Sequence, residues 1–129
     1  MSILAQLRVL VVDDMSTSRG LIIQALEAIG VKNILHAGDG QEAIRVLLSN
    51  PVHLVLSDYN MPQMDGLQLL QAIRGNPATQ KIGFILITGR PEQAVIDRGR
   101  AIGMNNFIKK PFTAAELKKC LEAVIGPIR

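Results

Sequence analysis

The 129-residue chain is predicted to fold as an α/β domain around a five-stranded parallel sheet. Apolar, strand-like runs alternate five times with amphipathic helical runs, the pattern of repeated βαβ units. Four of these strand-like runs end in, or lead directly to, reactive polar side chains. Ligands of an open α/β sheet bind beyond the carboxyl ends of its strands, so these side chains are predicted to form one site.

The first strand is predicted at Leu7–Val12 and leads directly into Asp13 and Asp14. Apolar residues of the next segment recur at helical spacing, namely at Leu21, Ile22, Ala25, Leu26 and Ile29. Gly30 is predicted to end this helix in a left-handed conformation. A short second strand is predicted at Asn33–Ala37.

Asp39 is predicted to cap the second helix, and Asn50-Pro51 to end it. Its apolar face comprises Ala43, Ile44, Val46, Leu47 and Leu48. The third strand, Val52–Ser57, is closed by Asp58 and followed by a loop rich in proline and glycine. The third helix that follows has the apolar positions Leu67, Leu69, Leu70 and Ile73.

The fourth strand, Phe84–Ile87, ends in Thr88, and Pro91 is predicted in the first turn of the next helix. That helix has the apolar positions Ala94, Val95, Ala101 and Ile102. Gly99 inside it costs about 1 kcal/mol relative to alanine, which predicts the softest helix of the domain.

The fifth strand, Asn106–Ile108, leads to Lys109-Lys110-Pro111. The last helix opens on a capping-box pattern at Thr113–Glu116. Its predicted buried positions are Leu117, Leu121, Val124 and Ile125.

Composition is typical of one globular domain over residues 1–129, with 48% hydrophobic residues. No apolar run approaches the roughly 20 residues that span a bilayer. The N-terminus lacks a signal-peptide pattern, and the single cysteine, Cys120, excludes an internal disulfide and fits a reducing compartment. We therefore expect a cytoplasmic protein without a membrane segment.

The net charge of +3 is unevenly distributed, with −3 in residues 1–66 and +6 in residues 67–129. A basic half indicates either an acidic partner or a solvated surface. A nucleic-acid-binding module is disfavoured despite the pI of about 9.4, because the basic residues lack interleaved aromatics.

Asp13, Asp14 and Asp58 are predicted to converge as a magnesium site, since Mg²⁺ prefers carboxylate and carbonyl oxygens. Asp58 is also a candidate nucleophile, because a carboxylate can accept a phosphoryl group. The alternatives are structural: Asp13-Asp14 capping the next helix, and Asp58 forming a turn.

Together, the acidic pair, Asp58, Thr88 and Lys110-Pro111 follow four strands in a pattern that resembles response-regulator receiver domains, and most of all the stand-alone, CheY-like chemotaxis members. The most similar segments are Val12–Thr17, Ser57–Pro62, Met64–Leu67 and Lys110–Ala115. The resemblance implies a (βα)5 flavodoxin/CheY-like sheet in the order 2-1-3-4-5.

The same resemblance implies the metal ligands. Asp14, Asp58 and the backbone carbonyl of Asn60 would bind Mg²⁺, with Mn²⁺ able to substitute, and Asp13 would act through water. Asp58 would be the phosphoacceptor. Thr88 and Lys110 would contact the phosphoryl group, and the Lys110-Pro111 peptide bond would be cis.

Phe107 takes the place of a rotating aromatic residue, usually tyrosine, that is implied to follow Thr88 when the phosphoryl group is present. The alternative is a plain core aromatic. Gly89 and Arg90 follow Thr88 and are candidate modulators of access to the acyl phosphate; Arg90 departs from the acidic residue of the best-known relative, or is simply exposed.

Function follows from this resemblance. A histidine kinase of the CheA type would phosphorylate Asp58, and the monomeric product would bind the flagellar motor switch through a surface that includes Arg98, Arg100, Lys118 and Lys119. A phosphate sink for a shared kinase is the close alternative. The protein is expected not to be an enzyme beyond slow self-dephosphorylation. An aspartate-nucleophile phosphohydrolase is disfavoured, because its nucleophile would follow the first strand and a cap domain has no room here.

Overall fold

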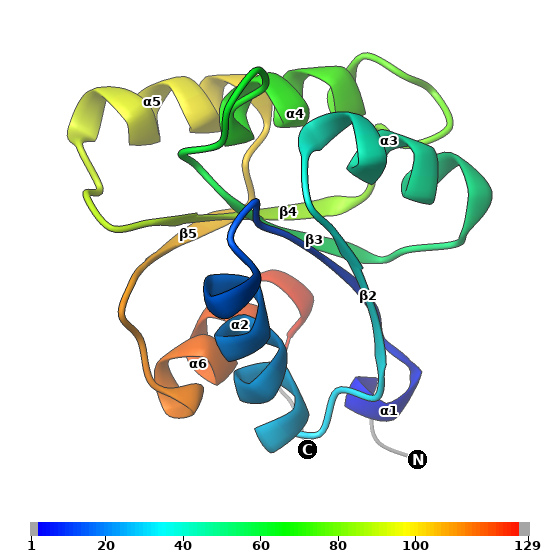
Figure 1. Ribbon diagram of the computed structural model, residues 1–129, viewed down its shortest axis with the longest axis vertical. Helices are drawn as coiled ribbons and strands as arrows, with labels where there is room; N and C mark the ends of the chain where they lie inside the picture. The colour runs from blue at the N-terminus through cyan, green and yellow to red at the C-terminus, as the bar shows by residue number, and fades with distance from the viewer. Residues whose placement is uncertain (1–2, 127–129) are drawn as a thin grey trace.

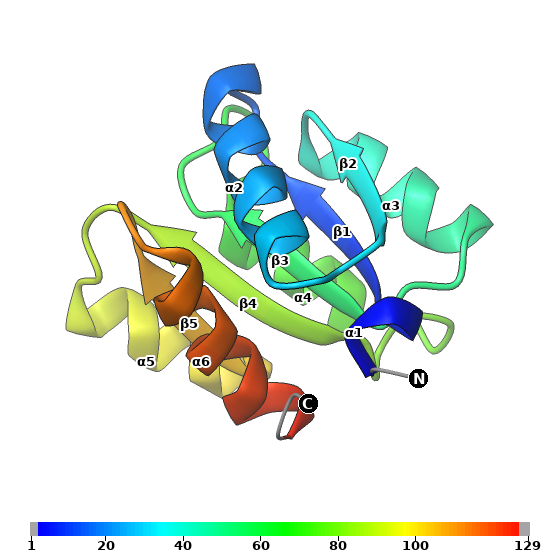
Figure 2. The same ribbon diagram turned by 90° about the horizontal axis from the view of Figure 1, so that it is seen from below.

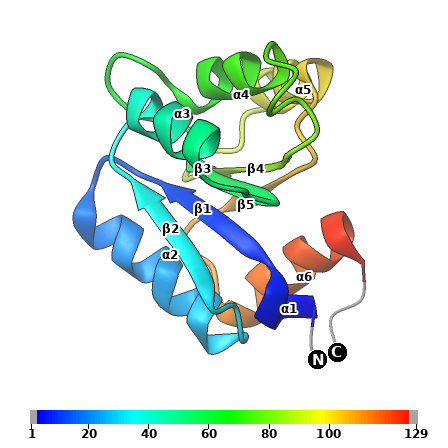
Figure 3. The ribbon, with the colours of Figure 1, turned by 90° about the vertical axis from the view of Figure 1, so that its right-hand side faces the viewer.

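The computed structural model describes residues 3–126, which form one sheet of five parallel strands in the order β2-β1-β3-β4-β5. The strands are β1 (Arg8–Val12), β2 (Asn33–Ala37), β3 (Leu54–Asp58), β4 (Gly83–Thr88) and β5 (Asn106–Lys109). The predicted fold class and strand order are confirmed. β1 lies between β2 and β3, so the first strand of the chain is a central one (Figure 3).

Helices cover both faces of the sheet (Figure 1 and Figure 2). They are α1 (Ile3–Gln6), α2 (Ser16–Ala28), α3 (Gly40–Ser49), α4 (Gly66–Arg74), α5 (Gln93–Ile102) and α6 (Ala114–Ile125). α3, α4 and α5 pack on one face, and α1, α2 and α6 lie on the other. The domain therefore has two hydrophobic cores with the sheet between them.

Alternate residues of the central strands point to opposite faces of the sheet and pack in the two cores. In β1, Leu10 and Val12 face α3–α5, whereas Val9 and Val11 face α2 and α6. All residues of β3 are buried, as expected for a parallel strand covered on both faces. This double burial explains why the strands appear in the sequence as unbroken apolar runs.

Several local predictions are confirmed. Gly30 follows α2 with a φ of 104°, a conformation that favours glycine. The Asp39 side chain accepts a hydrogen bond from the Glu42 N–H at the start of α3. Thr113 and Glu116 form the capping box of α6.

Other local predictions are wrong. Leu21 and Leu48, assigned to apolar helix faces, are 62% and 55% exposed. Ala94 and Ala101 of α5 are exposed too, and Ile96 is buried in their place. Pro91 lies outside α5, which begins at Gln93. Spacing alone predicted the helices, but it included exposed residues in their apolar faces and missed the buried Ile96.

Gly99 has a packing role that its helix propensity does not reveal. It is buried in α5, and a Cβ added there would lie 2.8 Å from the Met104 sulfur and 3.3 Å from Leu67 Cδ2. A side chain at this position would require the Met104 and Leu67 side chains to shift, so glycine favours the close packing of α5 against them.

Arg74, in the last turn of α4, joins two connections of the sheet. Its Nη1 donates to the carbonyls of Gln80 (3.0 Å) and Ile82 (2.6 Å), in the segment before β4. Its Nη2 donates to the Gly103 carbonyl (2.9 Å) and to Asn105 Oδ1 (3.0 Å), in the segment before β5. The guanidinium thus fixes where two neighbouring strands begin.

The short helix α1 was not predicted. It buries Leu4, and Leu7 is buried just after it, so these residues close the core on the α2–α6 side. Four residues are too few to show helical periodicity in a sequence. Within residues 3–126, no helix has the length and apolar character needed to cross a membrane.

Candidate functional site

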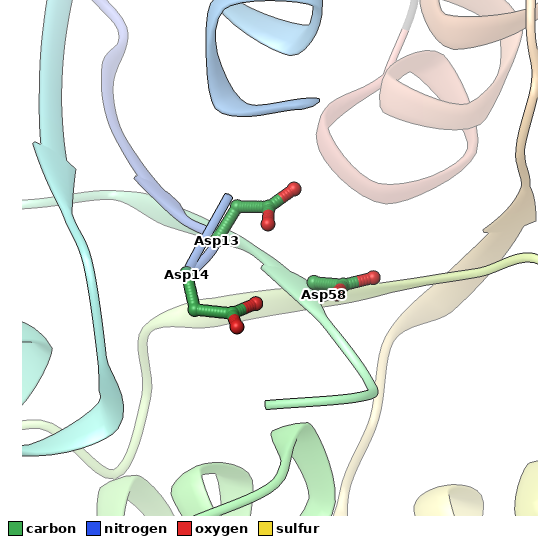
Figure 4. Close-up of side chains that lie close together, drawn as sticks. All are labelled: Asp13, Asp14 and Asp58. Carbon is green, nitrogen blue, oxygen red and sulfur yellow. The ribbon is translucent and has the colours of Figure 1, made fainter. Parts of the chain in front are cut away.

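Three carboxylates meet where the central strands end. Asp13 and Asp14 follow β1, and Asp58 is the last residue of β3 (Figure 4). Because β1 and β3 pair with Val12 opposite Ser57, the residues that follow these positions emerge side by side. One carboxylate oxygen from each of the three lies within 4.8 Å of the others.

The three carboxylates differ in burial and hydrogen bonding. Asp13 is fully buried, Asp58 is 5% exposed and Asp14 is exposed. Asp13 Oδ1 accepts a hydrogen bond from the Met15 N–H (3.0 Å). Asp13 Oδ2 is buried and has no hydrogen-bond partner among the residues described.

This donor set fits a hard divalent cation. A buried, unpartnered carboxylate oxygen is costly unless a water or an ion satisfies it. Carboxylate oxygens are the ligands that Mg²⁺ prefers, directly or through its waters. Asn60, whose carbonyl was predicted as a ligand, follows β3 by two residues and lies at the same edge of the sheet.

Lys110 supplies the positive charge nearest the acceptor candidate. Its Nζ lies 2.9 Å from Asp58 Oδ1 and 3.4 Å from Ser18 Oγ. The Lys110 N–H donates to the Thr88 carbonyl (3.0 Å). This bond continues the pairing of β4 with β5 one residue past the end of β5. The Lys110-Pro111 peptide bond is cis, as the resemblance implied.

Burial and Lys110 shift the pKa of the Asp58 carboxyl in opposite directions. Burial is the largest effect and raises the pKa of the Asp58 carboxyl, and the nearby Asp13 and Asp14 raise it further. The hydrogen bond and charge of Lys110 lower the pKa again. The net result is a raised pKa for the Asp58 carboxyl, and the hydrogen bond and charge of Lys110 offset part of that increase.

Thr88 ends β4 and is 2% exposed. Its hydroxyl donates to the Arg90 carbonyl (3.2 Å) and accepts from the Arg90 N–H (3.1 Å). The hydroxyl is thus engaged with the backbone of the β4–α5 connection. Gly89 and Arg90 are exposed.

Phe107 lies in β5 on the same face of the sheet as Thr88, since Leu86 pairs with Phe107 and Thr88 with Lys109. The ring is half-buried. The guanidinium carbon of Arg100 lies 5.9 Å from its centroid, a cation–π distance. This contact joins a predicted switch residue to a predicted surface residue and has no signal in the sequence.

The predicted surface residues lie on the two helices that flank β5. Arg98 and Arg100 are exposed on α5, Lys119 is exposed on α6, and Lys118 beside it is half-buried. These four cations therefore lie on the two helices that cover opposite faces of the sheet next to its edge strand, β5.

Two residues near the carboxylates were not predicted. Ser18 contacts Lys110, and Arg19 Nη1 donates to the Asp13 carbonyl (2.9 Å). Both belong to the first turns of α2. Neither residue belongs to a recognised sequence motif. Both contacts depend on the orientation that the turn at Asp13-Asp14 gives to α2.

A parallel sheet in this order, with an acidic cluster and a lysine at its carboxyl edge, defines a receiver domain. The chain belongs to this family, because the family model described as "Response regulator receiver domain" matches residues 9–122.

Within the family the chain is CheY-like. It is 45% identical to a protein of Rhizobium etli named "Probable chemotaxis protein CheY", over the whole length of both chains. It is 38% identical to chemotaxis protein CheY1 of Helicobacter pylori, over 93% of this chain and 98% of the relative.

Solved structures agree. Chemotaxis protein CheY4 of Vibrio cholerae superposes with a TM-score of 0.86 at 28% identity, covering 92% of this chain and 98% of that one. The receiver domain of a sensor histidine kinase from Pseudomonas aeruginosa, solved with a magnesium ion in its active-site cleft, gives a TM-score of 0.83 at 26% identity. That match covers 94% of this chain and 98% of the other. Proteins of this class signal rather than catalyse.

Proposed function

We propose that this chain is a magnesium-dependent phosphoacceptor that takes a phosphoryl group from a histidine kinase onto Asp58. The observation that carries the proposal is the placement of the Asp58 carboxylate, within 4.8 Å of two other carboxylates and 2.9 Å from Lys110 Nζ. A nucleophile, a candidate cation site and a fixed positive charge are thereby adjacent.

In the proposed reaction, a free oxygen of Asp58 attacks the phosphorus of a phosphohistidine. The oxygen–phosphorus bond forms as the phosphorus–nitrogen bond breaks, and the histidine nitrogen leaves with the electron pair. Asp14, Asp58 and the Asn60 carbonyl would hold Mg²⁺, with Asp13 acting through water, and the bound ion would supply positive charge beside the transferring group. Lys110 is positioned to contact a phosphoryl oxygen once its pairing with the free carboxylate is lost.

The metal assignment has independent support. The buried, unpartnered Asp13 Oδ2 calls for a water or an ion. A receiver domain of similar fold holds magnesium in its active-site cleft. Mn²⁺ has the same preference for oxygen ligands and is proposed as a substitute.

The signal is proposed to leave by protein binding. The chain acts as a single receiver domain, monomeric and cytoplasmic, and receives its phosphoryl group from a kinase of the CheA type. The proposed target is the flagellar motor switch, consistent with the chemotaxis relatives. Incubation with a small phosphodonor and Mg²⁺, followed by mass spectrometry, tests the first step: one added phosphoryl group should map to Asp58.

A phosphate sink is the second candidate, and Phe107 is the observation that favours it. A phenylalanine at the switch position has no hydroxyl to offer a partner, which weakens one means of reading the phosphorylated state. Rapid loss of phosphate without detectable binding to the motor switch protein would favour the sink over the motor-binding role.

Thr88→Ala and Lys110→Ala should still accept phosphate to some extent but transmit the signal poorly. Both residues are proposed to contact the phosphoryl group, so their loss should reduce the bias toward the active conformation. The gain in partner affinity on phosphorylation should therefore be about one fifth of the gain in the parent chain. The measurement is partner affinity with and without phosphorylation.

Two variants control this experiment. Thr88→Ser retains the hydroxyl, and Lys109→Ala removes a neighbouring exposed cation; both should behave as the parent does. If Thr88→Ala and Lys110→Ala bind the partner as tightly as the phosphorylated parent, the proposed switch role is wrong.

The basic surface should govern how fast the partner associates. Reversing Lys118 and Lys119 to glutamate should slow association about tenfold at low salt, with little effect on phosphorylation of Asp58, because long-range charge acts mainly on association rate. The parent rate should fall steeply with salt. Stopped-flow association with the phosphorylated protein measures both effects.

Lys32→Glu with Lys81→Glu is the matched control for this double reversal. These exposed lysines precede β2 and β4, at the amino ends of the strands. Equal association rates for the Lys118/Lys119 reversal and the parent at low salt would show that the basic surface is merely solvated.

A further inference from the structure

Arg19 lies where two connections meet beside the acidic cluster. Its Nη1 donates to the Asp13 carbonyl at 2.9 Å. The same atom would lie 3.8 Å from a Cβ placed on Gly38, so the guanidinium lies close to the β2–α3 connection. The side chain therefore spans from the first turns of α2 across the end of β1 toward the end of β2.

Arg19 and Lys110 bring positive charge to the cluster in different ways. Lys110 pairs directly with a carboxylate oxygen, Asp58 Oδ1. Arg19 instead bonds to the main-chain oxygen of Asp13 and leaves its carboxylate alone. One oxygen of that carboxylate accepts from Met15, and the other has no partner in the described residues. Arg19 thus holds the Asp13-Asp14 turn without occupying an atom that a cation would use.

We propose that Arg19 is a positioning residue for Mg²⁺, which fixes the turn so that Asp13 and Asp14 stay directed at Asp58. Like charges in the cluster repel one another, and a turn free to relax would move the carboxylates of Asp13 and Asp14 away from that of Asp58. Groups that orient metal ligands contribute substantially to metal affinity even without touching the ion. This inference rests on the proposed magnesium-dependent function.

The proposal and simple electrostatics predict opposite changes in Mg²⁺ affinity when Arg19 is replaced. Removing a nearby positive charge should, by Coulomb attraction alone, strengthen binding of a divalent cation. Removing a residue that positions the ligands should weaken it. An Arg19→Met variant decides between the two effects, because methionine retains much of the apolar stem and has no donor for the Asp13 carbonyl.

The experiment is a Mg²⁺ titration of the full chain, followed by calorimetry and by tyrosine fluorescence. Tyr59 is the only tyrosine, the chain has no tryptophan, and Tyr59 adjoins Asp58, so the emission reports from the site. We expect Arg19→Met to bind Mg²⁺ about tenfold more weakly than the parent. Urea unfolding in EDTA measures the stability of the metal-free fold separately.

Arg8→Met is the matched control. It makes the same change in charge at the start of β1, where Arg8 is exposed. The site lies about 16 Å further along the strand, beyond the screening length of about 10 Å at 0.1 M salt. Its Mg²⁺ affinity should stay within twofold of the parent.

The outcomes separate this inference from the function on which it rests. If Arg19→Met changes only the urea midpoint, or binds Mg²⁺ as tightly as the parent or more tightly, Arg19 is not a positioning residue. If the methionine variant does not fold, Arg19→Leu, which is also neutral and has no donor, decides by the same criterion. A parent chain that binds no Mg²⁺ would overturn the proposed metal-dependent function and this inference together.

Discussion

Asp58→Asn is expected to abolish phosphorylation by a phosphorylated kinase and by a small phosphodonor alike. The amide is a very poor nucleophile, and the other two carboxylates belong to the proposed metal site. Chelation of Mg²⁺ should have the same effect on the parent chain, because the transferring group would then lose its main counter-charge. Intact-mass measurement after incubation gives the fraction phosphorylated, which should fall to background in both cases.

Asp39→Asn is the matched control for this prediction. Asp39 caps α3 through its side chain, and asparagine caps helices about as well as aspartate. The control should therefore be phosphorylated as the parent is. Undiminished phosphorylation of Asp58→Asn would show that another residue is the acceptor.

Arg74→Met is expected to lower the free energy of unfolding by about 2–4 kcal/mol, which is large for one side chain. The substitution removes donors from three main-chain carbonyls and from Asn105 Oδ1. Hydrogen bonds from a charged group are each stronger than neutral ones, and partly buried carbonyls would lose their partners. Urea unfolding of the metal-free protein measures the loss.

The control is Arg45→Met, an equal change in charge at an exposed position of α3. Exposed substitutions of this kind usually change stability by less than about 0.5 kcal/mol. A loss for Arg74→Met no greater than for Arg45→Met would mean that the bonds before β4 and β5 are replaced by water without cost.

The sequence predicted what depends on short-range order. Asp58 could be placed at the end of β3, and Asp13 and Asp14 at the end of β1, because an apolar run ending in a polar residue marks the end of a buried strand. The capping box at Thr113 was equally predictable, since its pattern is local. That these strand ends meet followed from the parallel sheet. The order of the strands came from the resemblance to receiver domains and not from the alternation of elements.

What the sequence did not reveal depends on contacts between distant segments. Arg74 bonds to Gly103, 29 residues away, and no spacing rule links the two. Arg19 gave no signal because its partner is a main-chain oxygen, whose direction depends on the turn after β1. Leu21 was assigned to the core by periodicity, whereas its side chain lies outside the contacts that α2 makes with the sheet and is exposed.

The central position of β1 has a consequence for synthesis. During translation the chain emerges from its N-terminus, so β1 gains one neighbour with β2 and its second only when β3 is complete. By that point Asp13, Asp14 and Asp58 can already come together, but Lys110 has yet to be made. Until β5 is made and joins the edge of the sheet, Asp58 therefore lacks the lysine with which it pairs in the complete domain. A divalent cation bound by these carboxylates would stabilise the folded domain by mass action, so the proposed metal site would also link the concentration of magnesium to the stability of the fold.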